Sequence, residues 1–124
     1  MSKGVYPAET PGDCLFCRIV KGEITSRKIF ENEELLAFKD INPQAPTHII
    51  IIPKKHIESL SGAGKEDAVL LGHLQLAVSE IAEKILGKNA AYRVVVNRGR
   101  EAGQSVFHLH YHLLAGRRFD WPPG

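Results

Sequence analysis

The sequence is poor in cysteine and carries no large excess of charge of either sign. Its 124 residues include two cysteines, Cys14 and Cys17, too few for the disulfide framework of a small secreted protein. Lys and Arg total 16 against 14 Asp and Glu, so the formal net charge is +2. The basic pairs Lys54-Lys55 and Arg117-Arg118 are isolated. Neither the total nor the spacing indicates a basic surface for nucleic acid.

Long hydrophobic runs are absent as well. No apolar stretch approaches the roughly 20 residues that a membrane-spanning helix needs, and the first residues lack the apolar core of a signal peptide. These absences predict a soluble, cytoplasmic protein that binds neither nucleic acid nor a membrane. A hydrophobic content of 44% and a charged content of 24% are ordinary for a globular chain, and the length suffices for one domain with its own core.

Turn-forming residues divide the chain into short elements. Residues 1–12 are expected to form a flexible arm, and residues 13–124 a single domain. Apolar residues at helical spacing predict a short helix over residues 13–22 and a long one over residues 65–86. Apolar runs between turns predict strands at residues 27–30, 35–39, 47–52, 92–96 and 105–114. Most connections are too short for helical crossovers, so we expect an α+β fold with about five mainly antiparallel strands.

Three histidines alternate with apolar residues in the last predicted strand. Successive side chains of a strand point to opposite faces, so His108, His110 and His112 are expected to share one face. A buried face would favour Val, Ile and Leu, and a solvated face would favour Thr, Lys or Glu. The row of histidines therefore indicates a functional site.

Such a row suits two kinds of chemistry. Three imidazoles can hold a catalytic zinc ion, or one imidazole can attack an electrophile while a neighbour manages protons. The residues upstream (Asn97, Gly103, Gln104 and Ser105) are small or polar, and glycine lets main-chain N–H groups approach a phosphate. Glu101 is the sole carboxylate nearby in sequence, which does not indicate a hard-metal site. The residues alone predict a histidine site that handles phosphate.

Four stretches of the chain, taken together in order, resemble a known family. They are residues 42–48 (NPQAPTH), 52–57 (IPKKHI), 103–114 (GQSVFHLHYHLL) and 121–124 (WPPG). The third is similar to the signature of the histidine triad (HIT) superfamily, His-φ-His-φ-His-φ-φ with φ apolar. Together they resemble the HINT branch, the histidine triad nucleotide-binding proteins that act as purine nucleoside phosphoramidases. The resemblance implies a HIT-like fold with one long and one or two short helices. It also implies a hydrolase of the adenosine 5′-monophosphoramidase type.

The resemblance implies a role for each histidine of the site. His110, the middle residue of the triad, would attack the α-phosphate of an AMP–amine or GMP–amine conjugate and form a nucleotidyl-histidine intermediate, which water then cleaves. The main-chain carbonyl of His108 would hold the other ring nitrogen of His110. His112 would lie near the leaving group, and His48 would support the cluster. This chemistry requires no cofactor.

Contacts to a purine nucleotide are implied as well. Asp40 would accept hydrogen bonds from the ribose hydroxyls. The groups implied to bind phosphate are Asn97, Ser105 and the main chain of Gly103 and Gln104. The apolar slot implied for the purine is formed by Phe16, Ile19, Phe38 and Ile41. From the residues alone, core packing is the better interpretation of Phe16, Ile19 and Phe38, and Asp40 also suits a turn.

The C-x-x-C at Cys14 and Cys17 has three interpretations. A redox dithiol would follow a thioredoxin-like strand, which the sequence does not provide, and two plain buried thiols are the simplest alternative. Some HIT proteins carry a structural zinc ion, and the resemblance implies that His56 and His108 would complete a tetrahedral Cys₂His₂ site here. The ring of His108 would then bind metal while its carbonyl orients His110.

The resemblance further implies a homodimer, with residues 65–86 at the interface and Trp121–Gly124 near the partner's active site. Two departures from the family are Thr25, where many relatives have proline, and the variable residues 117–120. An alternative function is hydrolysis of dinucleoside polyphosphates or nucleotidyl transfer, against which the ending Trp-Pro-Pro-Gly argues. A non-catalytic purine-nucleotide-binding dimer is another, and the complete triad argues against it.

Overall fold

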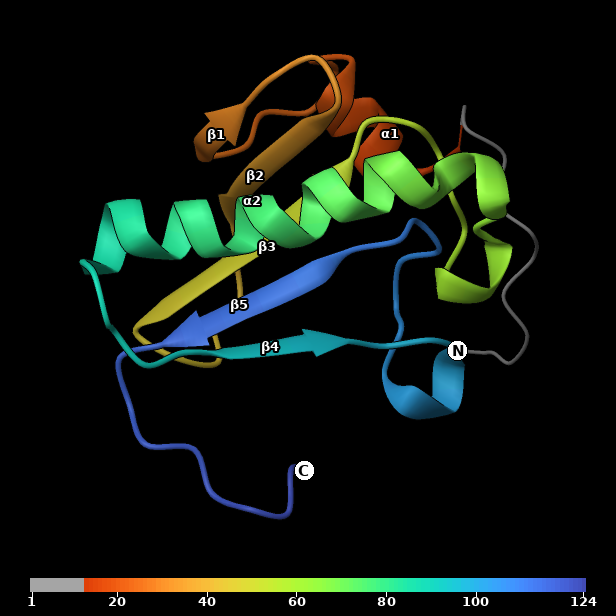
Figure 1. The fold of residues 1–124 in the computed structure, drawn as a ribbon. Helices are drawn as coiled ribbons and strands as arrows, with labels where there is room; N and C mark the ends of the chain where they lie inside the picture. Colours follow the sequence, from red (N-terminus) through yellow and green to blue (C-terminus); the bar gives the residue numbers. More distant parts are fainter. Residues whose placement is uncertain (1–12) are drawn as a thin grey trace.

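A sheet between two unequal helices organises the part of the chain that the structure describes, residues 13–124; the predicted arm at residues 1–12 lies outside it. In this computed structural model the sheet has five strands within the described range, in the order β1-β2-β3-β5-β4 (Figure 1). Every neighbouring pair is antiparallel. The strands are β1 (Lys28–Glu31), β2 (Leu35–Lys39), β3 (Thr47–Pro53), β4 (Arg93–Val96) and β5 (Tyr111–Ala115). The α+β prediction is confirmed.

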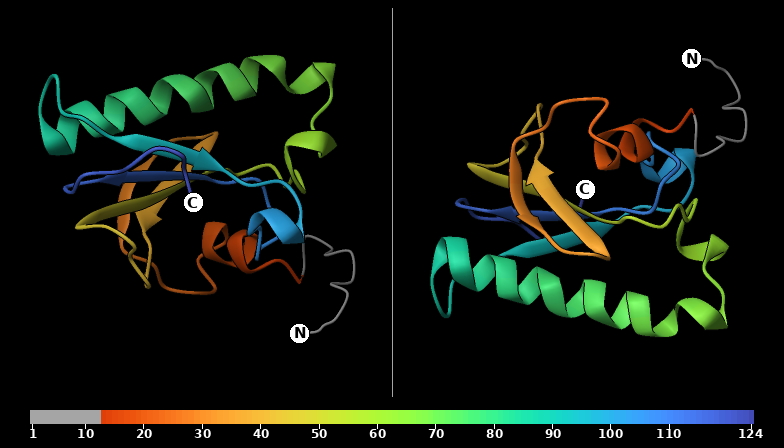
Figure 2. Two further views of the ribbon diagram at one scale, coloured as in Figure 1. Left: turned by 90° about the horizontal axis from the view of Figure 1, so that it is seen from below. Right: turned by 90° about the horizontal axis from the view of Figure 1, so that it is seen from above.

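The helices lie on opposite faces of the sheet. The long helix α2 (Ala68–Leu86) covers one face and the short helix α1 (Leu15–Val20) lies on the other (Figure 2). The short 3₁₀ turns η1 (Leu60–Gly62) and η2 (Lys65–Asp67) lie between β3 and α2, and η3 (Arg100–Ala102) lies between β4 and β5. Within residues 13–124 no helix has the length and apolar character needed to cross a membrane.

The four consecutive isoleucines of β3 are explained by this layering. Ile49 and Ile51 pack in the hydrophobic cluster under α2, and Ile50 and Ile52 pack in the cluster under α1. A strand covered on both faces has no solvent side, so it lacks the alternation of polar and apolar residues. The sequence of β3 predicts a fully buried strand, which the structure confirms.

Helix α2 begins and ends where its capping residues dictate. Before it, the buried carboxylate of Asp67 accepts the N–H of Gly64 at 2.9 Å and binds Lys55 Nζ at 2.5 Å. After it, Gly87 has a φ of 95°, a conformation that L side chains rarely adopt, and the helix stops. The predicted helix at residues 65–86 is confirmed, except that its first three residues form the 3₁₀ turn η2.

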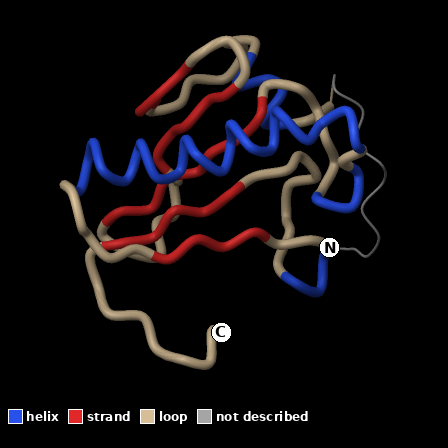
Figure 3. The backbone as a smooth tube through the Cα atoms, in the orientation of Figure 1, coloured by secondary structure: helices blue, strands red, loops and turns tan. Residues whose placement is uncertain are grey.

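Two predicted boundaries differ from the structure. The helix α1 is capped by Cys14, whose Sγ accepts the N–H of Cys17 at 3.4 Å, and not by Asp13. Strand β5 begins at Tyr111 and not at Ser105, so His108 and His110 precede it in an irregular stretch (Figure 3). The reason is that the N–H of Leu109 donates to the carbonyl of Ile57 at 2.6 Å, outside the ladder between β3 and β5.

We predict that Leu74→Ala lowers the free energy of unfolding by about 2–5 kcal/mol, because it leaves a cavity between α2 and the sheet. Leu74 is completely buried in the cluster under α2. The matched control is Leu60→Ala in η1, where the side chain is 41% exposed and the loss should stay below about 1 kcal/mol. Chemical denaturation of both variants measures the difference; equal losses would contradict this account of the core.

Candidate active site

Three histidines meet on the face of the sheet that carries α1. In the ladder between β3 and β5, His112 lies opposite Ile50 and His48 lies opposite Leu114. Opposite residues of an antiparallel pair project from the same face, so His48 and His112 are diagonal neighbours. The ring centroids of His110 and His112 lie 5.0 Å apart, and those of His48 and His112 lie 5.1 Å apart. The structure therefore brings His48, His112 and His110 into one row.

His110 is held as a neutral imidazole. Its Nδ1 lies 2.7 Å from the main-chain carbonyl of His108, which can only accept, so the proton is on Nδ1 and Nε2 keeps its lone pair. Burial lowers the pKa of His110, while the hydrogen bond to the carbonyl opposes that shift. The ring of Phe16 meets the His110 ring edge-on at 5.1 Å. This arrangement leaves an unprotonated nitrogen available for attack at neutral pH.

His112 and His48 form a hydrogen-bonded pair beside it. Nε2 of His48 lies 2.8 Å from Nδ1 of His112. Burial, followed by the neighbouring imidazoles His110 and His48, lowers the pKa of His112 to about 4. Burial also lowers the pKa of His48, with the carboxylate of Asp40 opposing it. Both rings are therefore neutral at physiological pH.

Asp40 faces this row from the loop after β2. Its Oδ2 lies 3.4 Å from Nε2 of His48, and its Oδ1 accepts the N–H of Asn42 at 2.7 Å. The side chain thus serves the turn considered from the sequence and also touches the histidine cluster. The next residue, Ile41, is fully exposed.

Three of the four residues predicted for the purine slot belong to the core. Phe16, Ile19 and Phe38 are all buried in the cluster under α1, and the rings of Phe16 and Phe38 lie 5.5 Å apart. Core packing is therefore part of their role. Phe16 also contacts the ring of His110, so the same packing places an apolar wall beside the candidate nucleophile.

The turn at residues 99–104, which precedes the triad histidines, is closed by its own main-chain hydrogen bonds. Gly103 has a φ of 102°, and a Cβ at this position would lie 3.4 Å from Asn97 Nδ2, so these two predicted residues are adjacent. The N–H groups of Gly103 and Gln104, expected to bind phosphate, donate in this structure to the carbonyls of Arg100 and Gly99 at 3.0 and 3.1 Å. The adjacent Ser105 is exposed.

The side chain of Gln104 has a role that the sequence did not indicate. It is buried, its Oε1 accepts the N–H of Gly99 at 2.9 Å, and its Nε2 donates to the carbonyls of Glu58 and Val106 at 2.8 and 3.2 Å. These bonds tie the turn to the segment after β3. No sequence signal marks this role, because all three partners are main-chain groups.

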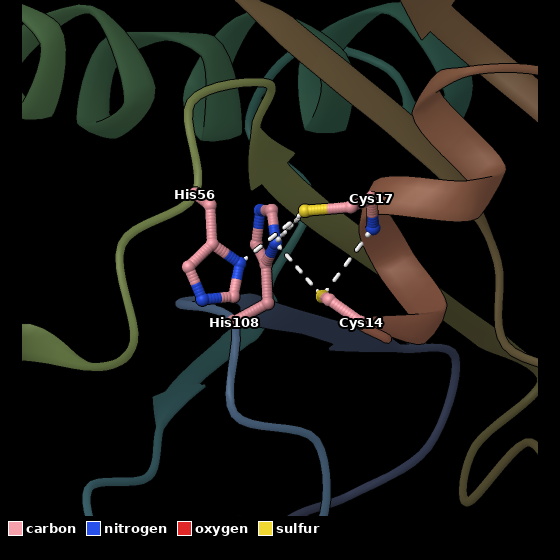
Figure 4. Close-up of side chains that lie close together, drawn as sticks. All are labelled: Cys14, Cys17, His56 and His108. Carbon is pink, nitrogen blue, oxygen red and sulfur yellow. Dashed lines mark hydrogen bonds between the residues drawn. The ribbon is translucent and has the colours of Figure 1, made fainter. Parts of the chain in front are cut away.

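The ring of His108 lies beside the two cysteines of α1. Its Nε2 donates to the carbonyl of Pro53 at 2.7 Å, so its Nδ1 carries a lone pair. That nitrogen lies 3.3 Å from Cys14 Sγ and 3.5 Å from Cys17 Sγ, and Cys17 Sγ lies 3.3 Å from Nδ1 of His56 (Figure 4). The expectation that the three imidazoles share one face is confirmed: Leu109, Tyr111 and Leu113 pack in the cluster under α2, and Phe16 of α1 contacts the rings of both His108 and His110.

A tetrahedral metal site fits four side chains, those of Cys14, Cys17, His56 and His108. Their ligand atoms all lie within 4.8 Å of one another, and both cysteines are free thiols. Zinc with bonds of about 2.3 Å to sulfur and 2.0–2.1 Å to nitrogen sets neighbouring ligands roughly 3.3–3.8 Å apart, which matches the S···N separations. The Pro53 carbonyl supplies the outer hydrogen bond that fixes the tautomer of a metal-binding histidine. Thiol–imidazole hydrogen bonds are the alternative for the same distances.

A hollow of about 860 Å³ opens elsewhere, at the ends of β1, β2 and β3 toward the last turn of α2. Of the predicted site residues it touches Asp40, Ile41 and His48, and neither His110 nor His112 lines it. The histidine row is defined by its hydrogen bonds and not by this hollow.

Comparison with known proteins agrees with the geometry. A family model described as HIT domain matches residues 21–119. An uncharacterized HIT-like protein of Synechocystis sp. is 51% identical over 90% of this chain and 97% of its own length, and a 14 kDa zinc-binding protein of Zea mays is 48% identical over 89% and 87%. The crystal structure of a HIT family hydrolase from Legionella pneumophila Philadelphia 1 has a TM-score of 0.86 at 45% identity, covering 90% of this chain and 99% of that one. A match of this extent shows that the chain belongs to the HIT domain family.

Proposed function

We propose that this protein is a hydrolase that cleaves the P–N bond of purine nucleoside 5′-phosphoramidates through a nucleotidyl intermediate on His110. One observation carries the proposal: Nδ1 of His110 is held by the carbonyl of His108 at 2.7 Å, which leaves Nε2 free to attack. Similar solved structures from Legionella pneumophila and Clostridium thermocellum are described as HIT family hydrolases. A cytoplasmic location fits the two free thiols, since disulfides persist in oxidising compartments.

The reaction proceeds in two displacements at phosphorus. Nε2 of His110 forms a bond to the α-phosphorus while the P–N bond breaks, and the amine nitrogen takes up a proton from solvent as it leaves; the attacking water of the second step returns one proton to solvent. Water then attacks the same phosphorus, which releases the nucleoside monophosphate and restores the lone pair of His110. Dividing the transfer into two easier steps is the advantage of a nucleophilic side chain. His112, whose ring is 5.0 Å away, is the neighbour placed to contact the leaving group.

The nucleotide would lie along the α1 face of the sheet. Asp40, near His48, would accept hydrogen bonds from the ribose hydroxyls. The wall made by Phe16 beside His110 would cover the purine, together with Ile19, Phe38 and the exposed Ile41. Asn97, Ser105 and the turn at Gly103 and Gln104 would contact the phosphate, with the two main-chain N–H groups available only if their bonds within the turn open.

A zinc ion would be held by Cys14, Cys17, His56 and His108. Bound there, it would supply structural cross-linking between α1, the segment after β3 and the stretch before β5, without touching the substrate. The zinc-binding protein of Zea mays, 48% identical, supports this proposal. The chemistry at His110 needs no other cofactor.

We also propose that the protein forms a homodimer through α2. Val69 and Leu76 are large apolar residues on the outer side of α2, and most of each side chain is exposed. Strand β4 ends the sheet, so one of its edges has no neighbouring strand within residues 13–124. Exposed apolar residues on a helix beside an open sheet edge are typical of an interface between copies.

We predict that His110→Ala and His110→Asn lower turnover of an AMP–amine conjugate by at least about a thousandfold, because they remove the nucleophile. Calorimetry should still detect AMP binding. Glu33→Ala, at an exposed position in the turn between β1 and β2, is the control and should keep wild-type activity. Mass spectrometry of enzyme quenched during turnover should find an AMP adduct on His110, and full activity in either variant would disprove the assignment.

A diadenosine polyphosphate, assayed in parallel, separates the proposed function from the alternatives. We expect a much larger kcat/KM for the AMP–amine conjugate. A preference for the dinucleotide would favour a polyphosphate hydrolase, and AMP binding without turnover of either compound would favour a non-catalytic binder.

Protein purified without added metal is predicted to contain about one zinc ion per chain. Cys14→Ser and Cys17→Ser should each reduce the zinc content and lower the thermal midpoint, because the metal joins three segments of the chain. His73→Ala is the matched control for loss of a histidine outside the cluster. Elemental analysis measures the metal, and a zinc-free wild type would refute the site.

Leu76→Glu is predicted to convert the dimer to a monomer, since a buried unpaired carboxylate is costly at an interface. Light scattering after size-exclusion chromatography measures the mass. Leu15→Glu, which replaces a partly exposed leucine on α1 at the opposite face, should leave the mass unchanged. A monomeric wild type would contradict the proposed assembly.

A further inference from the structure

The residues that hold His48 and His112 determine which ring nitrogens carry protons. The main-chain N–H of Gln44 points at Nδ1 of His48 over 3.0 Å. An amide N–H can only donate, so Nδ1 of His48 must accept and carries no proton. The proton of neutral His48 is therefore on Nε2.

The same reasoning applies to His112, whose ring is hydrogen-bonded to that of His48. Nε2–H of His48 lies 2.8 Å from Nδ1 of His112, so that nitrogen is an acceptor as well. The proton of neutral His112 is then on its Nε2. A further proton could bind at Nδ1 of either ring only if a hydrogen bond of this chain breaks. The carboxylate oxygen of Asp40, 3.4 Å from Nε2 of His48, is a second acceptor for the same proton and favours the same arrangement.

The main chain of Gln44 is itself held by the segment after β5, through the peptide group that follows the N–H facing His48. Its carbonyl accepts the Nε–H of Arg117 at 3.1 Å. The guanidinium carbon of Arg117 lies 4.2 Å from the centroid of the Phe119 ring, which restricts its rotation. One residue earlier, a Cβ on Gly116 would lie 2.8 Å from Cβ of Pro46, so the two segments are in close contact. Residues 116–119 thus fix the loop that sets the tautomer of His48.

We propose that Arg117 and the Gln44 peptide are positioning groups that hold the His48–His112 pair in one neutral tautomer, with Nε2–H of His112 as the donor available to the substrate. His112 then offers a hydrogen bond to the leaving group or to a phosphate oxygen, as a neutral imidazole does in other enzymes, and no proton transfer from it is required. The effect on turnover rests on the proposed function, whereas the tautomer does not.

The tautomer can be tested directly by NMR of protein with ¹⁵N-labelled histidine and glutamine. Two-bond ¹H–¹⁵N correlations at neutral pH should assign protons to Nε2 of both His48 and His112. Couplings across hydrogen bonds should connect the Gln44 amide nitrogen to His48 Nδ1, and His48 Nε2 to His112 Nδ1. A proton on Nδ1 of His112, or an imidazolium at either residue, would overturn the proposal.

The role of Arg117 is tested by Arg117→Ala against Arg118→Ala. Arg118 is exposed, and its main-chain carbonyl, which Arg117 also contacts, is unaffected by the substitution. Loss of one hydrogen bond of about 1 kcal/mol predicts a kcat reduced about fivefold in Arg117→Ala, with KM changed less than about twofold. The NMR spectrum of Arg117→Ala should show a second tautomer of His48 and His112. Arg118→Ala should match the wild type in both measurements.

Gly116→Ala is an independent perturbation of the same contact, because the added methyl group forces the loop at Pro46 to move. It should shift the His48 and His112 tautomers in the same direction as Arg117→Ala. A wild-type tautomer and a wild-type kcat in Arg117→Ala would refute the positioning role. If the wild type does not hydrolyse phosphoramidates, the proposed function fails, and the NMR comparison still decides whether these groups set the tautomer.

Discussion

The hydrogen bond from Nδ1 of His110 to the carbonyl of His108 is the interaction on which the proposed chemistry depends. It fixes the orientation of the ring and leaves its second nitrogen unprotonated. The carbonyl is in place because His108 is itself held, through Nε2 at the Pro53 carbonyl and through Nδ1 at the cysteines of α1. His108 thus links the cluster around the cysteines of α1 to the proposed reactivity of His110.

The two faces of the sheet provide two different environments. Its α2 face packs a continuous apolar cluster, whereas its α1 face carries the histidine row. The register of β3 against β5 places His48 diagonally beside His112, and a slip of β5 by one residue would move His112 to the face under α2, away from His48. The sheet order also leaves β4 at an edge. Strand β4 therefore contributes both to the core under α2 and to the proposed interface.

Features set by interactions between residues close in the sequence were predicted well, and features set by contacts between distant segments were not. Strands β2 and β3 and helix α2 follow from hydrophobic pattern and capping residues, and they were predicted closely. The three triad histidines share the α1 face as predicted, whereas the start of β5 was predicted six residues too early, because Leu109 bonds outside the ladder. Gln104 was expected near phosphate through its main chain, whereas its side chain closes the turn onto Glu58 and Val106.

The sequence by itself determined the fold class, the family, and the residue types of both clusters, since periodicity and the four ordered stretches are carried by side chains. The tertiary structure alone decided where β5 begins and which ring nitrogens of His48, His108 and His112 bear protons. Those outcomes depend on main-chain carbonyl and N–H groups at Pro53, His108 and Gln44. Every non-proline residue carries the same two groups, so only the folded positions distinguish them.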